Sequence, residues 1–418
     1  MLRSVLYRSV LHRDIRLVCV CAKMFFILII EWGRVATRIA TADAPLEGTK
    51  PAQWRLVWTT DPATTAKVIW NTAEEGKSHA LLIGEKGEEK REVAAQVNGQ
   101  YGDNPVYFHR VQLSDLSPET TYEEQMVSDG EKSPTFYFIT APDDDRPFSM
   151  LFGGDSRSSS PTRRAMNKFM AQLVAESYGD DEPSNDILAL AHGGDYIVSG
   201  RSFSQWLQWM KDHELTVSKD GQLLPIIPAR GNHDGGPLFD QVFGFPERDR
   251  NYYTTQLSEQ LTFITLNTEI SVGGDQTEWL KEQLKAARPK SRWVLAQYHR
   301  PAFPAVKIPG RALAYWVPLF EEYNVDMVCE ADGHVIKRTL PIRNNEHDKT
   351  GVVYIGEGGL GVGQRSPKSD RWYLKSPGMS GKGHHVQLLT FSEKSLDYKC
   401  VTLESGVVDR YSRSPRER

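Results

Sequence analysis

Five polar residues with metal-ligand chemistry each follow an apolar run in this 418-residue chain, close to the point where the run ends. They are Asp155, Asp195, Asn232, His299 and His334. The apolar runs alternate with helical patterns, which predicts the strands of an α/β sheet. Because the carboxyl ends of such strands line the ligand crevice, we expect these side chains to converge although they are distant in sequence.

The donor types indicate the kind of metal. Carboxylate and amide oxygens mixed with imidazoles suit Fe, Mn or Zn better than Ca or Mg, and we expect one or two ions per chain. Each motif alone is weak, because Gly-Asp is common in turns and a single histidine is usually structural. The Gly231-Asn232-His233-Asp234 turn is more specific, and the order of all five residues together predicts a metal-dependent site.

The elements that position these residues are predicted from Pro147 onward. Strands are expected at 148–152, 187–191, 224–229, 261–266, 292–297 and 325–329. Helices are expected at 162–177, near 202–215, and at 276–287 and 312–323. The chain then returns to strands near 351–355, 384–391 and 396–403.

The stretch from Trp54 to Pro142 shows a different pattern. Short runs alternate apolar and polar residues between turn signals, which predicts a β-sandwich. It contains no cluster of metal ligands or nucleophiles, so we expect an accessory module, and 141–147 reads as a linker. The predicted organisation is a segment 1–42, a sandwich 43–142 and an α/β domain 146–410.

Charge and cysteine content exclude some functions. The formal charge of the whole chain is −4. Residues 1–42 contribute +5, so the remaining residues carry −9. This argues against a broad nucleic-acid-binding surface. The 4 cysteines lack CxxC spacing, which excludes a zinc ribbon or a disulfide scaffold.

Residues 1–42 are typical of a targeting segment. A basic start, an apolar run at 17–30 broken by Lys23, and Ala40-Thr41-Ala42 indicate an export signal, and hence a secreted or periplasmic protein. The run is too short for a stable membrane span. The alternatives are a basic tail and a translation start at Met24.

The chain resembles the calcineurin-like metallophosphoesterases, and among them the purple acid phosphatases. The motifs above carry this resemblance, together with Val57-Trp58-Thr59-Thr60 and the closing segment 355–409. The N-terminal module is similar to a fibronectin type III domain, notably at Leu116–Tyr122. The implied fold is two stacked β-sheets flanked by helices, preceded by an all-β fibronectin- or immunoglobulin-like sandwich.

The resemblance also implies roles for single residues. Asp155 matches a ligand of the first metal, and Asp195 matches the carboxylate that both metals share. Asn232, His299 and His334 match the remaining ligands of the second metal. His233, directly after Asn232, matches the histidine that faces the substrate phosphate. Asp234 is expected to orient the His233 ring.

The departures from the family pattern fall on the first metal pocket. The general Asp-x-His motif is Asp155-Ser156-Arg157 here, and Val198 stands where purple enzymes have an iron-binding tyrosine. The second histidine of Gly-His-x-His is replaced by Ile336. If the first metal is absent, Arg157 would place a fixed positive charge at its position. The guanidinium could then hold a phosphate through two hydrogen bonds. Glu330, Asp332 and Glu357 are possible replacement ligands, although each is more often structural.

Two functional hypotheses follow. The first is a metal-dependent phosphoric ester hydrolase of the acid phosphatase type, with an impaired first metal site and a small phosphate ester as substrate. The alternative is an exported protein that binds a phosphate ligand and has lost hydrolysis. The sequence leaves the substrate, the metal, the residual activity and the oligomeric state open.

Overall fold

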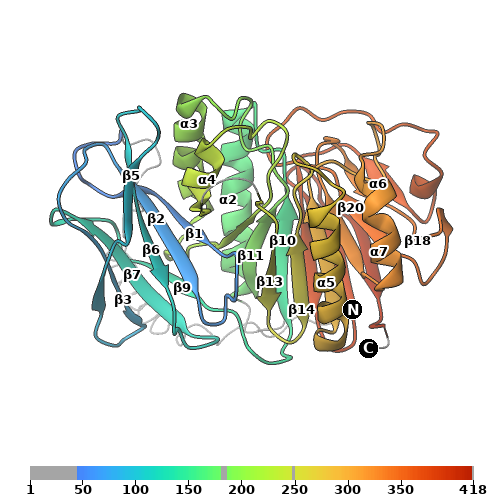
Figure 1. The fold of residues 1–418 in the computed structure, drawn as a ribbon, viewed down its shortest axis with the longest axis horizontal. Helices are drawn as coiled ribbons and strands as arrows, with labels where there is room; N and C mark the ends of the chain where they lie inside the picture. Colours follow the sequence, from blue (N-terminus) through green and yellow to red (C-terminus); the bar gives the residue numbers. More distant parts are fainter. Residues whose placement is uncertain (1–44, 180–185, 247–249, 417–418) are drawn as a thin grey trace, which may run out of the picture. The chain divides into compact units, whose positions relative to one another are not determined.

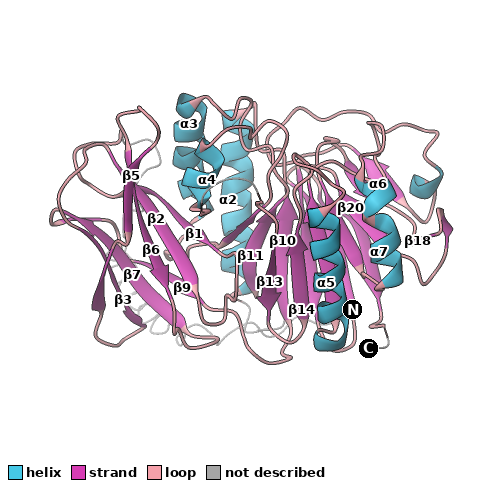
Figure 2. Cartoon of the chain, in the orientation of Figure 1, coloured by secondary structure: helices cyan, strands magenta, loops and turns pink. Residues whose placement is uncertain are grey.

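The computed structural model describes residues 45–179, 186–246 and 250–416. Their strands form four sheets (Figures 1 and 2). The largest has the order β24-β23-β22-β10-β11-β12-β1-β2-β6-β5, and the second β13-β14-β15-β16-β20-β17-β21. A third sheet runs β4-β3-β7-β8 with β9 on β7, and β18 pairs with β19.

The N-terminal strands form the predicted sandwich. They are β1 Ala52–Val57, β2 Ala66–Thr72, β3 His79–Glu85, β4 Arg91–Ala94, β5 Val97–Gln100, β6 Tyr107–Leu113, β7 Thr121–Ser128, β8 Glu131–Lys132 and β9 Phe136–Ile139. Burial alternates along β7, as expected of a strand with one face in a core. The Tyr122 hydroxyl accepts a hydrogen bond from Ser117 N at 2.8 Å, which closes the fibronectin-like corner.

The remaining strands and helices build the α/β part. Its strands are β10 Phe148–Gly153, β11 Ile187–His192, β12 Ile226–Pro228, β13 Tyr253–Leu257, β14 Leu261–Thr265, β15 Trp293–Tyr298, β16 Met327–Glu330, β17 Ile336–Arg338, β18 Ile342–Arg343, β19 Glu346–His347, β20 Val353–Gly356, β21 Met379–Gly381, β22 His385–Phe391, β23 Leu396–Thr402 and β24 Gly406–Arg413. Its α-helices are α2 Ser160–Ser177, α3 Phe203–His213, α4 Leu238–Phe243, α5 Asp275–Lys290, α6 Ala312–Tyr315 and α7 Val317–Glu322.

The two large sheets pack face to face with helices outside them, so the expected fold class is confirmed. Phe152 of β10 and Leu295 of β15 belong to the core between the sheets. On the other face of β10, Leu151 packs with Met166 and Met170 of α2. Helices α5 to α7 cover the outer face of the second sheet in the same way. This alternation follows from side chains pointing to opposite faces of a strand.

Two features differ from the expected elements. The helix expected at 312–323 is divided into α6 and α7 at Trp316, next to Pro318, which cannot donate a helical hydrogen bond. The short helix α4 is not among the helices that the sequence predicts. No helix among the described residues is long and apolar enough to cross a bilayer. The predicted export segment lies outside the described residues.

The sandwich is continuous with the α/β part. Strand β1 pairs in parallel with β12, and Trp58 N donates to Ile226 O at 3.0 Å. Leu223 N donates to Tyr137 O at 2.8 Å on a second edge. The two modules therefore share one sheet instead of being joined only by the segment 141–147.

Candidate metal centre

Loops at the carboxyl ends of neighbouring strands carry the predicted ligands. Asp155 follows β10, Asp195 follows β11, Asn232 follows β12, His299 follows β15 and His334 follows β16. Three of them have left-handed backbones, with φ of 56° at Asp155, 60° at Asp195 and 62° at His334. Such strained conformations concentrate at functional sites, because the surrounding structure must hold them.

Two glycines allow the loops to approach this closely. A Cβ at Gly358, where φ is +82°, would lie 2.0 Å from Asp155 Oδ2. A Cβ at Gly231 would lie 2.3 Å from Asp195 N. Both distances are far below van der Waals contact, so any side chain at these positions would displace a predicted ligand.

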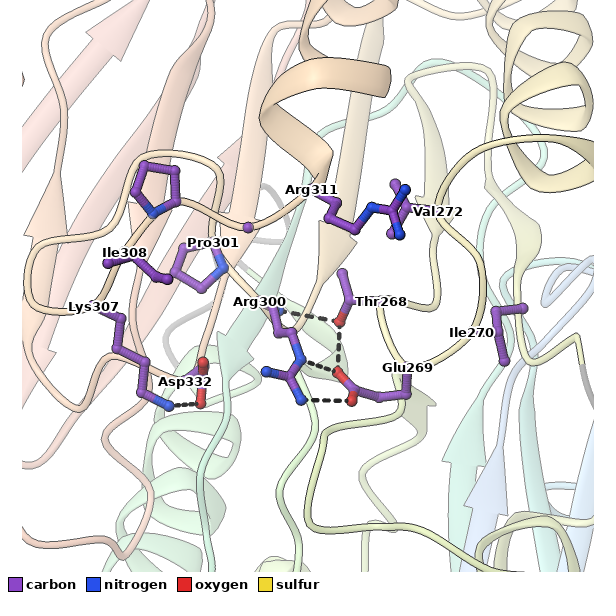
Figure 3. Close-up of a pocket in the computed structure, with 12 residues that line it drawn as sticks. Thr268, Glu269, Ile270, Val272, Arg300, Pro301, Lys307, Ile308, Arg311 and Asp332 are labelled. Carbon is purple, nitrogen blue, oxygen red and sulfur yellow. Dashed lines mark hydrogen bonds and ion pairs between the residues drawn. The ribbon is translucent and has the colours of Figure 1, made fainter.

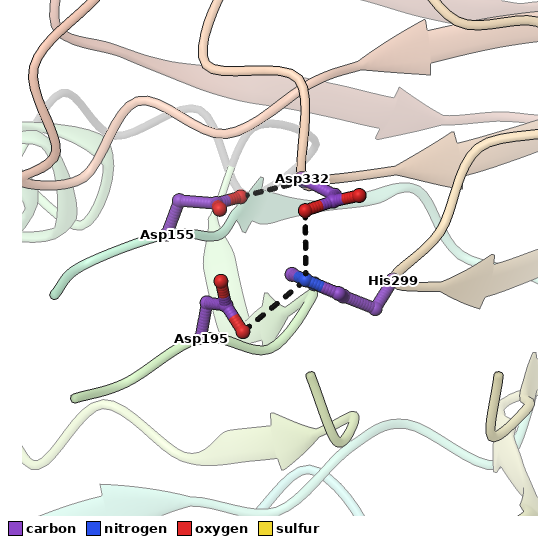
Figure 4. A group of neighbouring side chains, drawn as sticks. All are labelled: Asp155, Asp195, His299 and Asp332. Atoms are coloured by element: carbon purple, nitrogen blue, oxygen red, sulfur yellow. Dashed lines mark hydrogen bonds and ion pairs between the residues drawn. The ribbon is translucent and has the colours of Figure 1, made fainter. Parts of the chain in front are cut away.

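Four buried side chains form a compact group, which we call the ligand group: Asp155, Asp195, His299 and Asp332 (Figure 4). One donor atom from each lies within 4.8 Å of the others. His299 Nε2 is 3.2 Å from Asp195 Oδ1 and 3.5 Å from Asp332 Oδ1. The backbone N of Asp332 donates to Asp155 Oδ2 at 2.8 Å.

The other two predicted ligands border this group. Asn232 Oδ1 lies 3.2 Å from His299 Nε2, and His334 Nε2 lies 3.1 Å from Asp155 Oδ1. The structure thus brings all five predicted ligands together. It adds Asp332, which the sequence left as a possible replacement ligand. Asp332 follows an apolar strand, as the other ligands do, so the same positional rule could have found it.

The hydrogen bonds of His299 fix its tautomer. Its Nδ1 lies 2.8 Å from the carbonyl oxygen of Gly193, which can only accept, so Nδ1 carries a proton. In the neutral ring the lone pair is therefore on Nε2, which faces oxygens of Asp195, Asn232 and Asp332. A lone pair surrounded by acceptor oxygens needs a proton or a metal ion between them.

The pKa shifts follow from the same crowding. Burial lowers the pKa of His299, but the carboxylates of Asp195 and Asp332 outweigh burial and hold it well above its ordinary value. Burial raises the pKa of Asp195, but the His299 charge and hydrogen bond reverse this, so it lies below the usual range. The pKa of Asp332 is likewise lowered despite burial, by His299 and Lys307. The ligand group thus favours carboxylates in the charged form and a cation between them.

Two side-chain cations enter the ligand group. Arg157 Nε is 3.1 Å from Asp195 Oδ2, and Arg157 Nη2 is 3.3 Å from His334 Nε2. Lys307 Nζ donates to Asp332 Oδ1. Because His334 Nε2 accepts from Arg157, it cannot donate to Asp155. Asp155 Oδ1 is then buried without a hydrogen-bond donor from any described residue. Such an orphaned acceptor beside two carboxylates and two imidazoles fits a cation site.

His233 and Asp234 have separate environments. His233 Nδ1 donates to Val198 O at 2.6 Å, and its partly exposed ring places Nε2 3.9 Å from Asp195 Oδ2. The expectation that Asp234 orients this ring is wrong. The Asp234 carboxylate accepts from the backbone N of Gly231, Asp195 and Tyr196, at 2.8 to 3.0 Å. Burial and the Asp195 charge raise the pKa of Asp234 to about 8. Asp234 therefore connects the loop of Asp195 with the loop of Asn232. The carbonyl oxygen of Val198, and not Asp234, orients His233.

Glu330 and Glu357 are not ligands in this arrangement. Lys337 Nζ is buried between them, donating to Glu330 Oε2 and, at 2.8 Å, to Glu357 Oε1. Burial raises the pKa of Glu357 to about 7, although Lys337 counteracts it. This ion-pair network lies beneath the loop of His334, whose backbone N donates to Glu357 O at 2.7 Å. The backbone of Glu357 therefore holds a ligand loop, while its carboxylate is used in the ion-pair network.

Comparison with known proteins agrees with this architecture. The family model of the purple acid phosphatase N-terminal domain matches residues 51–140, and that of the calcineurin-like phosphoesterases matches 162–336. The chain is thus similar to the purple acid phosphatases in the order of its two modules as well as in its fold. The structure of purple acid phosphatase PPD1 from yellow lupin seeds superposes with a TM-score of 0.72 at 17% identity, covering 88% of this chain and 74% of that one.

Two curated relatives also match much of the chain. An uncharacterized protein of Mycobacterium tuberculosis is 22% identical over 67% of this chain, which spans 60% of the length of that relative. Purple acid phosphatase 23 of Arabidopsis thaliana is 24% identical over 76% of this chain and 75% of its own length.

Proposed function

We propose that this protein is a metal-dependent phosphoric ester hydrolase of the acid phosphatase type. The observation that carries the proposal is the set of oxygens around His299 Nε2, which a proton or a metal ion must separate, beside the buried and unpartnered Asp155 Oδ1. The proposed ligands are Asp195, Asn232, His299 and His334. We propose Asp332 as a further donor to the same ion. The donor set suits Fe, Mn or Zn. A bound transition metal would polarise a phosphate ester and make water acidic enough to attack phosphorus.

The side chains around the ligand group have proposed roles in the same reaction. Arg157 contributes a fixed positive charge beside Asp195, in the first metal pocket. Its guanidinium can donate two hydrogen bonds to the oxygens of one phosphate. His233, held through Nδ1 by Val198 O, presents Nε2 to donate a proton to the departing alkoxide. We therefore propose one tightly held metal assisted by an arginine, and we retain export from the cell as a proposal from residues 1–42.

The test combines metal analysis with turnover. The purified protein is analysed for bound metals, stripped with a chelator, and assayed for p-nitrophenyl phosphate hydrolysis after adding Fe, Mn or Zn from acid to mildly alkaline pH. We expect metal-dependent release of p-nitrophenol. Asn232→Ala, which removes one ligand, is expected to lose both metal and activity while keeping its circular dichroism.

The arginine in the first pocket also favours the second hypothesis, phosphate binding without hydrolysis. Metal loading and phosphate binding by calorimetry, with no turnover under any condition, would establish that alternative and overturn the hydrolase proposal. Absence of both metal and phosphate binding would exclude both hypotheses.

A further inference from the structure

A pocket of about 450 Å³ opens directly beside the ligand group (Figure 3). Asp332 belongs to both, since it is one of the four clustered donors and also lines the pocket. Arg300, which follows His299 in the chain, lines the pocket as well. A phosphate group at the ligand group would therefore have this pocket as a neighbouring space for the rest of its molecule.

The charges on the pocket wall are not balanced. Arg300, Lys307 and Arg311 line it together with two carboxylates, Glu269 and Asp332. Arg300 is paired with Glu269 through Nε at 2.9 Å and Nη2 at 3.0 Å. Lys307 is paired with Asp332. These two pairs use both carboxylates.

Arg311 is the remaining cation. Its guanidinium lies over the Tyr315 ring, 5.5 Å from the centroid, and no carboxylate of a described residue forms an ion pair with it. Figure 3 shows Arg311 and Val272 at one side of the pocket and the Lys307–Asp332 pair at the other. The surplus positive charge is thus separated from the ligand group by the width of the pocket.

Much of the remaining lining is apolar. Ile270, Val272, Pro301 and Ile308 contribute to it, and Ile308 is 81% exposed at the rim. The pocket therefore combines an apolar surface with one unmatched guanidinium, which forms charge-assisted hydrogen bonds to carboxylates and phosphates.

We propose that this pocket holds the alcohol portion of the substrate, and that Arg311 selects alcohols carrying a second anionic group, a carboxylate or a phosphate, beyond an apolar segment. The proposal rests on the proposed function, because it requires the first phosphate to bind at the ligand group. It goes further in naming the substrate class as phosphate esters with two separated anionic groups.

Binding of two matched phosphonates to the metal-loaded protein tests the proposal without turnover. One probe is an alkylphosphonate, and the other is a phosphonoalkanoate of the same chain length with a terminal carboxylate, measured by calorimetry over a series of lengths. We expect the carboxylate to improve affinity about tenfold or more at one or two lengths. In Arg311→Gln this preference is expected to disappear. Arg91→Gln, an exposed arginine on β4 of the sandwich, is the matched control and should keep it.

The outcomes separate this proposal from the one on which it rests. If alkylphosphonates bind but the carboxylate adds no affinity at any length, the second anionic subsite is wrong while the proposed phosphate site stands. If the preference survives in Arg311→Gln, a different residue provides it and the assignment is overturned. If no phosphonate binds, the phosphate site itself fails and this inference fails with it.

Discussion

At the scale of single residues, Arg157 bears most directly on the number of bound metals, because we propose that its charge stands in for the first metal. Its Nε is 3.1 Å from Asp195 Oδ2 and its Nη2 is 3.3 Å from His334 Nε2, so it places a positive charge beside the carboxylate that a second ion would have to share. We predict that Arg157→His raises the number of bound metals from one towards two per chain. The change removes the fixed charge and restores the Asp-x-His pattern of the wider family. Elemental analysis after dialysis against the metal measures the effect.

Arg157→Gln is the control for this change, because it removes the charge without supplying an imidazole. We expect it to remain near one metal per chain. Equal metal content in the wild type and the histidine variant would show that Arg157 does not stand in for the first metal.

Asp332 is the residue whose role the structure changes most. Asp332→Asn keeps the side-chain volume but removes a negative charge 3.5 Å from His299 Nε2. We predict that this change lowers the metal affinity by about tenfold or more. Competition with a chelator measures the affinity. Asp348→Asn, an exposed carboxylate that bonds to Thr350, should leave affinity unchanged. Unchanged affinity in Asp332→Asn would remove this residue from the ligand set.

The positional rule that polar residues follow apolar strands predicted five site residues from sequence, because parallel strands must bring their ends together. The same rule applied to Asp332 but could not separate a ligand from a structural acid. The wrong role for Asp234 has a similar cause. Its neighbour in sequence, His233, bonds to Val198 O instead, and only the fold shows that three backbone N–H groups donate to the Asp234 carboxylate.

At the scale of elements, β7 carries an unusual buried acid. Glu124 faces the sandwich core, where neither carboxylate oxygen meets a hydrogen-bond partner among the described residues. Burial raises the pKa of Glu124 to about 8, so the folded protein keeps this proton while the unfolded chain loses it above about pH 4.5. The folded state binds more protons between these values, so the free energy of unfolding falls as pH rises through this window, by roughly 1.4 kcal/mol per pH unit.

We predict that Glu124→Gln is more stable than the wild type near pH 8 and similar to it near pH 5, since glutamine does not ionise. Denaturant unfolding across this range measures the difference. Glu123→Gln, the adjacent residue that pairs with Lys90 at 3.1 Å on the other face of β7, should leave the pH dependence unchanged. A parallel pH dependence in Glu124→Gln and the wild type would mean that Glu124 is already ionised in the fold.

Element type was more predictable than element pairing. The alternation in 54–139 and the apolar stripe of 162–177 specify a sandwich and helix α2 locally, because burial imposes periods of two and 3.6 residues. The pairing of β1 with β12 joins Val57 to Ile226. No local pattern encodes a partner so distant in sequence, so the sequence predicted two modules but not their common sheet.

At the scale of the whole molecule, this common sheet makes the two modules one mechanical unit. Buried side chains of the sandwich reinforce it, since Arg55 Nε donates to Val242 O at 2.9 Å and Lys67 Nζ to Gly244 O at 2.8 Å. The described residues accordingly belong to one compact unit. Separating the modules would leave the edges of β1 and β12 and these cations unpaired, at a cost of about 1–3 kcal/mol for each buried group.

We therefore predict a single cooperative unfolding transition in differential scanning calorimetry, for both modules together. A metal that binds only the folded state stabilises it by mass action, so adding metal should move the whole transition to higher temperature. Asn232→Ala should also unfold in a single transition but should not respond to metal. Two transitions, of which metal shifts only one, would show that the sandwich unfolds independently and that the shared sheet does not couple it to the metal centre.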